Sequence, residues 1–205
     1  MKPPYWDQAK RELSRRDPVM GGIVRRFPRI YLTPRGDPFL TLARSIVGQQ
    51  ISVKAAQAVW ERVVAAMSDV TPGAAIETGP KRLLACGLSR RKVEYVLDLA
   101  ARFDGGELVP ERWQMMSDEQ VVAELVEVRG IGRWTAEMFL IFNLLRPDVL
   151  PLDDLGLQRA VSLRYRGGRS VSSGGIRRIA KDWQPWRSVA TWYLWRSLDP
   201  VPVEY

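Results

Sequence analysis

The chain has 205 residues and a mass of 23.3 kDa, which suits one ordinary domain or two small lobes built as a single unit. Its hydrophobic fraction of 46% can supply a core, and its charged fraction of 26% is normal for a soluble protein. This composition excludes a disordered chain and a membrane protein. Because no apolar stretch is long enough to span a bilayer and the first residues do not resemble a signal peptide, we expect a cytoplasmic protein.

The counts of histidine and cysteine exclude several kinds of chemistry. The chain has no histidine, so histidine general bases, triads and metal ligands are absent. It has one cysteine, Cys86, so disulfides, cysteine-rich zinc sites and iron–sulfur clusters are absent as well. The apolar neighbours of Cys86 predict a buried structural thiol. Any catalytic group must therefore be a carboxylate, lysine, hydroxyl or backbone group.

The net charge of +8 is unevenly distributed along the chain. Residues 1–36 and residues 164–187 each carry a net charge of +6, and the remainder carries −4. Two basic blocks indicate a polyanionic partner, most often nucleic acid, although a plain solvated surface explains the charge equally well.

In the first half of the chain, apolar spacing and capping residues predict helices rather than strands. Ser52 and Ser89 stand where helix N-caps are expected, and Pro80 stands inside the start of a short helix. The predicted helices cover residues 39–47, 53–63, 80–87 and 90–103. The only candidate for an extended segment is residues 30–32.

The second half of the chain shows the same helical pattern. Ser117 to Gln120 form a capping box that predicts a helix to about residue 128. Further helices are expected over residues 133–145, after Asp153, after residues 173–175, and over residues 185–198. We therefore predict an all-α protein with about nine helices.

The most informative stretch joins two of these helices through a Gly-Ile-Gly turn at residues 130–132. Two glycines let the backbone turn sharply and approach a ligand closely, and Ile131 can anchor the turn in the core. The amides of the turn and the start of the next helix would then form a phosphate-binding arrangement. A Gly-x-Gly alone is more often a plain turn, but here the acidic pair Asp153 and Asp154 follows downstream.

With these motifs the chain resembles the helix–hairpin–helix (HhH-GPD) DNA glycosylase superfamily and, within it, the 3-methyladenine DNA glycosylase II family. The resemblance covers nearly the whole chain. It implies two helical lobes with the active-site cleft between them, a barrel lobe at residues 39–145 that ends in the hairpin, and a second lobe of residues 1–38 and 147–205. The matching motifs, in chain order, are residues 39–52, 87–92, 130–136, 151–156 and 183–188.

The resemblance also implies roles for individual residues. Asp154 matches the catalytic aspartate. Asp153 is expected to be either a helix cap or a supporting carboxylate. Gln50 lies where the family inserts a side chain into the DNA stack. The positions that line the base pocket are Trp134, Trp195, Met138 and Leu155, of which Met138 and Leu155 are tyrosine in the best-known members, so base preference cannot be transferred.

For the hairpin, the resemblance implies contacts with the DNA backbone and a bound ion. The residues expected at the backbone are Gly130, Ile131, Gly132, Arg133 and Thr135. The carbonyls of Val126, Val128 and Ile131 match those that hold a monovalent cation, Na⁺ or K⁺, and no other cofactor is expected. Arg129 departs from the proline that is usual before Gly-x-Gly, which loosens the turn or adds a phosphate contact.

Together these features predict a monofunctional hydrolase that flips alkylated purines out of duplex DNA and starts base excision repair. In the lyase branch of the superfamily a lysine occupies the position of Trp134, so we expect no strand cleavage by Schiff-base chemistry. We expect a monomer that acts on DNA carrying alkylated bases, has no membrane partner, and associates with the nucleoid in a bacterial source. Two alternatives remain: a module that binds lesions without excising them, and a glycosylase for oxidised or mismatched bases.

Overall fold

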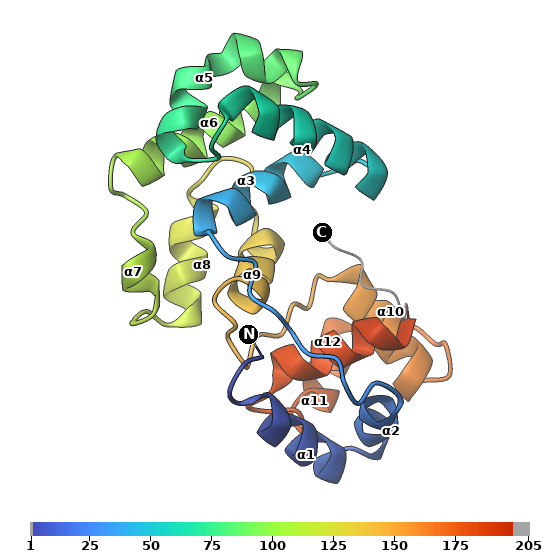
Figure 1. Ribbon diagram of the computed structural model, residues 1–205. Helices are drawn as coiled ribbons and strands as arrows, with labels where there is room; N and C mark the ends of the chain where they lie inside the picture. The colour runs from blue at the N-terminus through green and yellow to red at the C-terminus, as the bar shows by residue number, and fades with distance from the viewer. Residues whose placement is uncertain (1, 199–205) are drawn as a thin grey trace. The chain divides into compact units, whose positions relative to one another are not determined.

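The computed structural model describes residues 2–198, and within this range every regular element is a helix (Figure 1). The all-α prediction is therefore confirmed, and residues 30–32 form no strand. The part of the second lobe predicted at residues 199–205 lies outside the described residues. The helices are α1 Trp6–Arg16, α2 Pro18–Arg26, α3 Pro38–Gly48, α4 Val53–Met67, α5 Pro72–Ala85, α6 Arg90–Asp104, α7 Pro110–Trp113, α8 Asp118–Val126, α9 Arg133–Phe142, α10 Leu155–Tyr165, α11 Ser173–Ile179 and α12 Arg187–Leu198.

The helix starts predicted from capping residues are confirmed. The hydroxyls of Ser52, Ser89 and Ser117 accept hydrogen bonds from the third backbone N–H of α4, α6 and α8, each at 3.3 Å. In α5 the backbone leaves the helical region at Gly79, where φ is 68°, and the helix restarts at Pro80 as predicted. Short polar side chains at these positions satisfy amides that have no partner inside the helix.

Three helices that the sequence analysis did not predict, α1, α2 and α7, bring the number among residues 2–198 to twelve. The start of α2 was predictable from the sequence, because an aspartate followed by a proline, Asp17–Pro18, is a typical helix start. In the structure Asp17 accepts hydrogen bonds from the N–H groups of Val19 and Met20. The same carboxylate accepts from the Tyr165 hydroxyl and the Trp183 indole, at 2.5 and 2.9 Å. Only the tertiary fold could reveal that Asp17 ties the N-terminal helices to C-terminal ones.

The helices divide into two compact units. Among the described residues, the first unit joins residues 2–34 to residues 140–198, and in it α12 packs against α1, α2 and α10 (Figure 1). Its core is built on large side chains that are almost completely buried: Trp6, Leu13, Met20, Trp183 and Tyr193. None of the helices within residues 2–198 is both long and apolar enough to cross a membrane.

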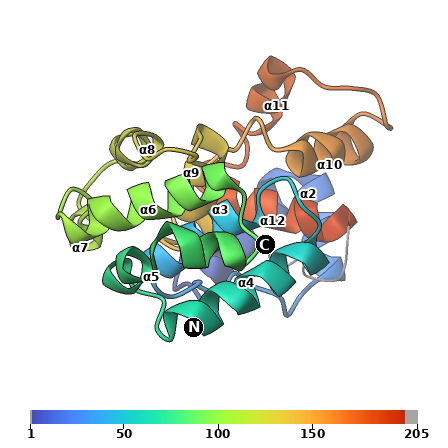
Figure 2. The same ribbon diagram turned by 90° about the horizontal axis from the view of Figure 1, so that it is seen from above.

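The second unit runs from Arg35 to Phe139 and contains α3 to α8 and most of α9. In it α3 packs on α4 and α6, and α5 packs on the same two helices (Figure 2). A row of edge-on aromatic rings, with centroids 5.2 to 6.1 Å apart, crosses its core: Phe39, Phe103, Trp113 and Phe139. Cys86 is buried in this unit, as expected. This core supports the hairpin between α8 and α9.

Candidate active site and DNA-backbone hairpin

The hairpin lies where the sequence predicted it, between the end of α8 at Val126 and the start of α9 at Arg133. Ile131 is buried and its N–H donates to the Val128 carbonyl at 3.0 Å, so it anchors the turn as expected. Gly130 has φ of +85°, and a Cβ at this position would lie 2.1 Å from the ring of Tyr95. Both the backbone conformation and the packing therefore require glycine at position 130.

The hairpin also presents backbone donors that the fold leaves unused. The N–H groups of Gly130 and Gly132 have no acceptor among residues 2–198, and they lie just before the N-terminus of α9. A Cβ at Gly132 would meet no atom within 4 Å. Amides that point away from the protein at the positive end of a helix dipole can bind an anion such as a phosphate. The turn thus has the donors and the open space that its predicted role needs.

The other two predicted hairpin residues are engaged within the protein. The Arg133 guanidinium bonds the carboxylates of Glu119 and Glu137, at 2.5 to 3.1 Å, and Thr135 is buried. The hydrogen bonds that Arg133 donates to Glu119 raise the pKa of Arg133 more than its partial burial lowers that pKa. Gly132 is therefore exposed with an unused amide, whereas the guanidinium of the equally exposed Arg133 is already bonded to two carboxylates.

The loop predicted to insert into DNA, after α3, is tied to the hairpin. Gln50 is exposed with φ of 58°, a conformation that side chains seldom adopt. The neighbouring Gln49 donates from its side-chain amide to the Gly130 carbonyl at 2.8 Å. The Lys92 ammonium donates to the carbonyls of Val47 and Gln49, both at 2.7 Å, and burial lowers its pKa. Sequence reasoning did not identify Gln49 or Lys92, although Lys92 closes the motif at residues 87–92.

In the first unit, Asp154 is the buried acidic residue of the predicted pair. Its Oδ1 accepts a hydrogen bond from the Leu157 N–H at 2.6 Å and another from the Trp195 indole at 2.7 Å. Asp154, and not Asp153, is therefore the N-cap of α10. Of the two roles left open for Asp153, the helix cap is wrong and the supporting carboxylate stays a prediction. Asp153 is exposed to solvent. Two donors and the helix N-terminus stabilise the negative charge on a carboxylate with 8% of its surface exposed.

The indole of Trp195 is held beside this carboxylate from two sides. Its ring stacks on Phe142, with centroids 5.7 Å apart and planes inclined by 12°. A Cβ at Gly156 would lie 3.0 to 3.1 Å from the indole and from Asp154, so glycine is what allows them to come this close. Gly156 lies within a motif noted in the sequence, but only the tertiary structure reveals the packing role of Gly156 and Phe142.

The remaining residues predicted for the base pocket are distributed over both units. Leu155 starts α10 in the first unit and is 77% exposed. Trp134, which is 37% exposed, and the half-buried Met138 lie on α9 within the second unit. Of the predicted set, the structure places Asp154 and Trp195 in direct contact. The roles of the others in a pocket stay predictions.

The predicted cation ligands at the hairpin are backbone carbonyls, a neutral oxygen donor that monovalent cations accept. The Val128 carbonyl already accepts the Ile131 N–H, and a carbonyl oxygen has a second lone pair for an ion. The donor chemistry of Val126, Val128 and Ile131 therefore fits such an ion. Among residues 2–198, no group of three or more acidic, cysteine or histidine side chains could hold a metal ion.

Comparisons with a family model, with curated sequences and with solved structures all point to the same family of proteins. A family model described as HhH-GPD superfamily base excision DNA repair protein matches residues 43–186. DNA-3-methyladenine glycosylase 1 of Schizosaccharomyces pombe is 32% identical over 166 residues, covering 78% of this chain and 72% of that protein. The chain spans between 58% and 72% of the length of three curated relatives that it matches.

Two solved structures resemble the fold over nearly their full length. The 3-methyladenine DNA glycosylase of Schizosaccharomyces pombe in complex with abasic DNA matches with a TM-score of 0.81 and 29% identity, covering 93% of this chain and 96% of that one. The DNA-3-methyladenine glycosidase of Bacillus halodurans matches with a TM-score of 0.79 and 32% identity, covering 89% and 90% of the two chains.

Proposed function

Because the chain belongs to the HhH-GPD superfamily of base excision DNA repair proteins, we propose that it is a monofunctional DNA glycosylase that excises alkylated purines of the 3-methyladenine type from duplex DNA. The observation that carries the proposal is the buried Asp154 carboxylate, held by the Leu157 N–H and the Trp195 indole. The printed names of the similar proteins, DNA-3-methyladenine glycosylase and glycosidase, support the choice of substrate.

The proposed chemistry needs no histidine and no cofactor. An alkylated purine already carries a positive charge, so it leaves readily as the glycosidic bond breaks and the sugar becomes an oxocarbenium-like cation. Asp154 stabilises that cation and orients or deprotonates the attacking water. The base must first leave the DNA stack, and an electron-rich indole such as Trp195 suits a cationic purine.

The hairpin supplies the hold on the DNA backbone in this proposal. The unused N–H groups of Gly130 and Gly132 bind a phosphate, and a monovalent cation on the carbonyls of Val126, Val128 and Ile131 would add positive charge beside it. Neither contact involves a base, so binding through the hairpin is independent of the DNA sequence. We propose that the protein acts as a monomer.

The direct test is release of free 3-methyladenine from methylated duplex DNA by the purified chain. A protein that only recognises lesions would bind the same DNA and release nothing. A glycosylase for oxidised or mismatched bases would instead act on other members of a panel of single-lesion duplexes. Release of the alkylated purine alone is the result we expect.

We predict that base release leaves the DNA strand intact. Trp134 occupies the position at which the lyase branch has a lysine, so no amine is expected to attack the sugar. Borohydride added during the reaction should trap no covalent enzyme–DNA adduct, and nicks should appear only after alkali. A stoichiometric trapped adduct would overturn the monofunctional assignment.

A second prediction concerns Gln50, which is exposed on the loop after α3. Gln50→Ala should weaken binding to an abasic-site analogue more than binding to undamaged duplex. The reason is that filling a vacated stack offsets an unstacking cost of a few kcal/mol. Gln49→Ala is the matched comparison, because Gln49 bonds the hairpin at Gly130 and its loss should weaken binding to both DNAs. If Gln50→Ala also weakened both equally, Gln50 would be an ordinary loop residue.

A further inference from the structure

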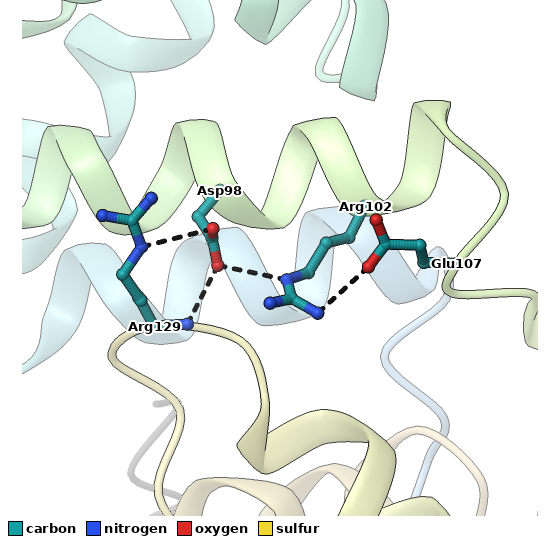
Figure 3. Close-up of polar contacts among 4 residues, drawn as sticks. All are labelled: Asp98, Arg102, Glu107 and Arg129. Atoms are coloured by element: carbon teal, nitrogen blue, oxygen red, sulfur yellow. Dashed lines mark hydrogen bonds and ion pairs between the residues drawn. The ribbon is translucent and has the colours of Figure 1, made fainter.

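The arginine at the hairpin that departs from the family pattern is held in a defined position. Arg129 precedes Gly130, and its side chain is 64% exposed. Its backbone N–H donates to Asp98 Oδ2 at 3.0 Å and its Nε donates to Asp98 Oδ1 at 3.3 Å (Figure 3). Both the backbone N–H of Arg129 and the Nε of its guanidinium group therefore bond the same carboxylate, that of Asp98 on α6.

Asp98 is itself well anchored. Its side chain is 13% exposed, and its Oδ2 also accepts from Arg102 at 3.3 Å, while Arg102 bonds Glu107 at 3.1 Å (Figure 3). Burial raises the pKa of Asp98, but the hydrogen bonds from Arg129 and the charges of Arg102 and Arg129 outweigh it and the pKa is lowered. Asp98 thus stays charged at neutral pH and forms a stable support for Arg129.

The two arginines of the hairpin differ in what their guanidinium groups can still bind. Arg133 donates from all three side-chain nitrogens to the carboxylates of Glu119 and Glu137. Figure 3 draws contacts to Asp98 from the Nε and the backbone N–H of Arg129, and its two terminal nitrogens have no hydrogen-bond partner among residues 2–198. These nitrogens belong to the same turn as the unused amides of Gly130 and Gly132.

We propose that Arg129 is a phosphate-binding residue of the hairpin and that Asp98 is the residue that positions it. The inference rests on the proposed function, since it assumes that duplex DNA is the ligand. A guanidinium presents a planar fork of donors that matches a phosphate, which a proline at this position could not supply. Because Asp98 already orders the side chain, less conformational entropy is lost when the phosphate binds.

The test is a titration of lesion-free duplex at several salt concentrations between about 50 and 200 mM. Wild-type protein should show a linear fall of log K with log salt. Arg129→Gln should reduce the steepness of that line by about 0.9, the value for one phosphate contact, and weaken binding about tenfold at the lowest salt. Arg129→Lys keeps the charge and should retain the wild-type slope.

Arg102→Gln is the matched control, because it removes the same charge from a residue that bonds the same Asp98 but faces Glu107 instead of solvent. Its slope should equal that of the wild type. Arg102→Gln should also excise at the wild-type single-turnover rate, because Arg102 bonds Asp98 and Glu107 and is not placed on the DNA.

The outcomes separate the inference from the function on which it rests. A wild-type protein that binds duplex with no dependence on salt would contradict the proposed function itself. Normal wild-type behaviour with an unchanged slope for Arg129→Gln would overturn the inference alone. An equal loss of slope in Arg102→Gln would also overturn it, because the effect would then reflect net charge rather than a phosphate contact.

Discussion

Asp154→Asn should abolish excision while leaving lesion binding unchanged or stronger. Asparagine has the same size and is an equally good N-cap, so it can still accept the Leu157 N–H and the Trp195 indole. What it lacks is the negative charge that meets the developing sugar cation, an interaction that is stronger in the transition state than in the ground state. We expect a loss of at least ~10²-fold in the single-turnover release of 3-methyladenine.

Asp153→Asn is the control for this experiment, because Asp153 is the adjacent carboxylate but is exposed and does not cap α10. It should lose much less activity than Asp154→Asn. Binding is measured on an uncleavable analogue, where removing a charge beside a polyanion eases repulsion. Near wild-type excision by Asp154→Asn, or an inactive Asp153→Asn, would show that the catalytic carboxylate is wrongly assigned.

Gly130→Ala should destabilise the protein strongly. The added methyl group would lie 2.1 Å from the Tyr95 ring, on a backbone with φ of +85°. Strain in the backbone and overpacking each cost about 1–3 kcal/mol, so the free energy of unfolding should fall by roughly 2–6 kcal/mol. For a chain of this size that corresponds to a fall in Tm of about 5–25 °C, measured by thermal unfolding.

Gly132→Ala provides the contrast two residues along the same turn. Its φ is not positive and no atom lies within 4 Å of the added Cβ, so the Tm should stay within about 2 °C of wild type. Duplex affinity should nevertheless fall about tenfold, because the methyl group would occupy the space in front of the unused amides. If Gly132→Ala bound DNA normally, the phosphate would have to lie elsewhere on the hairpin.

Local signals in the sequence were sufficient for most helices and for the turn. Caps at Ser52, Ser89 and Ser117 depend only on residues three positions away, and the hairpin depends on two glycines around a buried isoleucine. The prediction failed for α1, α2 and α7. In α1 three buried residues are interspersed with charged ones, α2 has two adjacent glycines in its middle, and α7 is four residues long. Helices α1 and α2 are stabilised by distant contacts, such as those of Asp17 with Tyr165 and Trp183.

The identity of the candidate site residues came from motif resemblance, whereas their working geometry came from packing. The resemblance alone pointed to Asp154 as the candidate catalytic carboxylate. Three features of the site depend on residues 2 to 41 positions apart. Trp195 donates to Asp154, Gly156 leaves room for the indole, and Asp154 rather than Asp153 caps α10. A one-residue shift in a helix start decides which carboxylate is buried.

By itself, the sequence determined the all-α class, the position of the hairpin and the candidate residues Asp154 and Gln50, because caps, glycines and short motifs act over a few positions. The tertiary structure alone decided which charged groups are neutralised and which remain available. Arg133 and Arg129 are four residues apart and chemically identical. Arg133 bonds Glu119 and Glu137 with its guanidinium nitrogens, whereas Arg129 bonds Asp98 through Nε and its terminal nitrogens have no hydrogen-bond partner among residues 2–198. Glu137 lies four residues after Arg133 on α9 itself, which is a local contact. The carboxylates of Asp98 on α6 and Glu119 on α8 reach the turn through the packing of the helices, which no local pattern predicts.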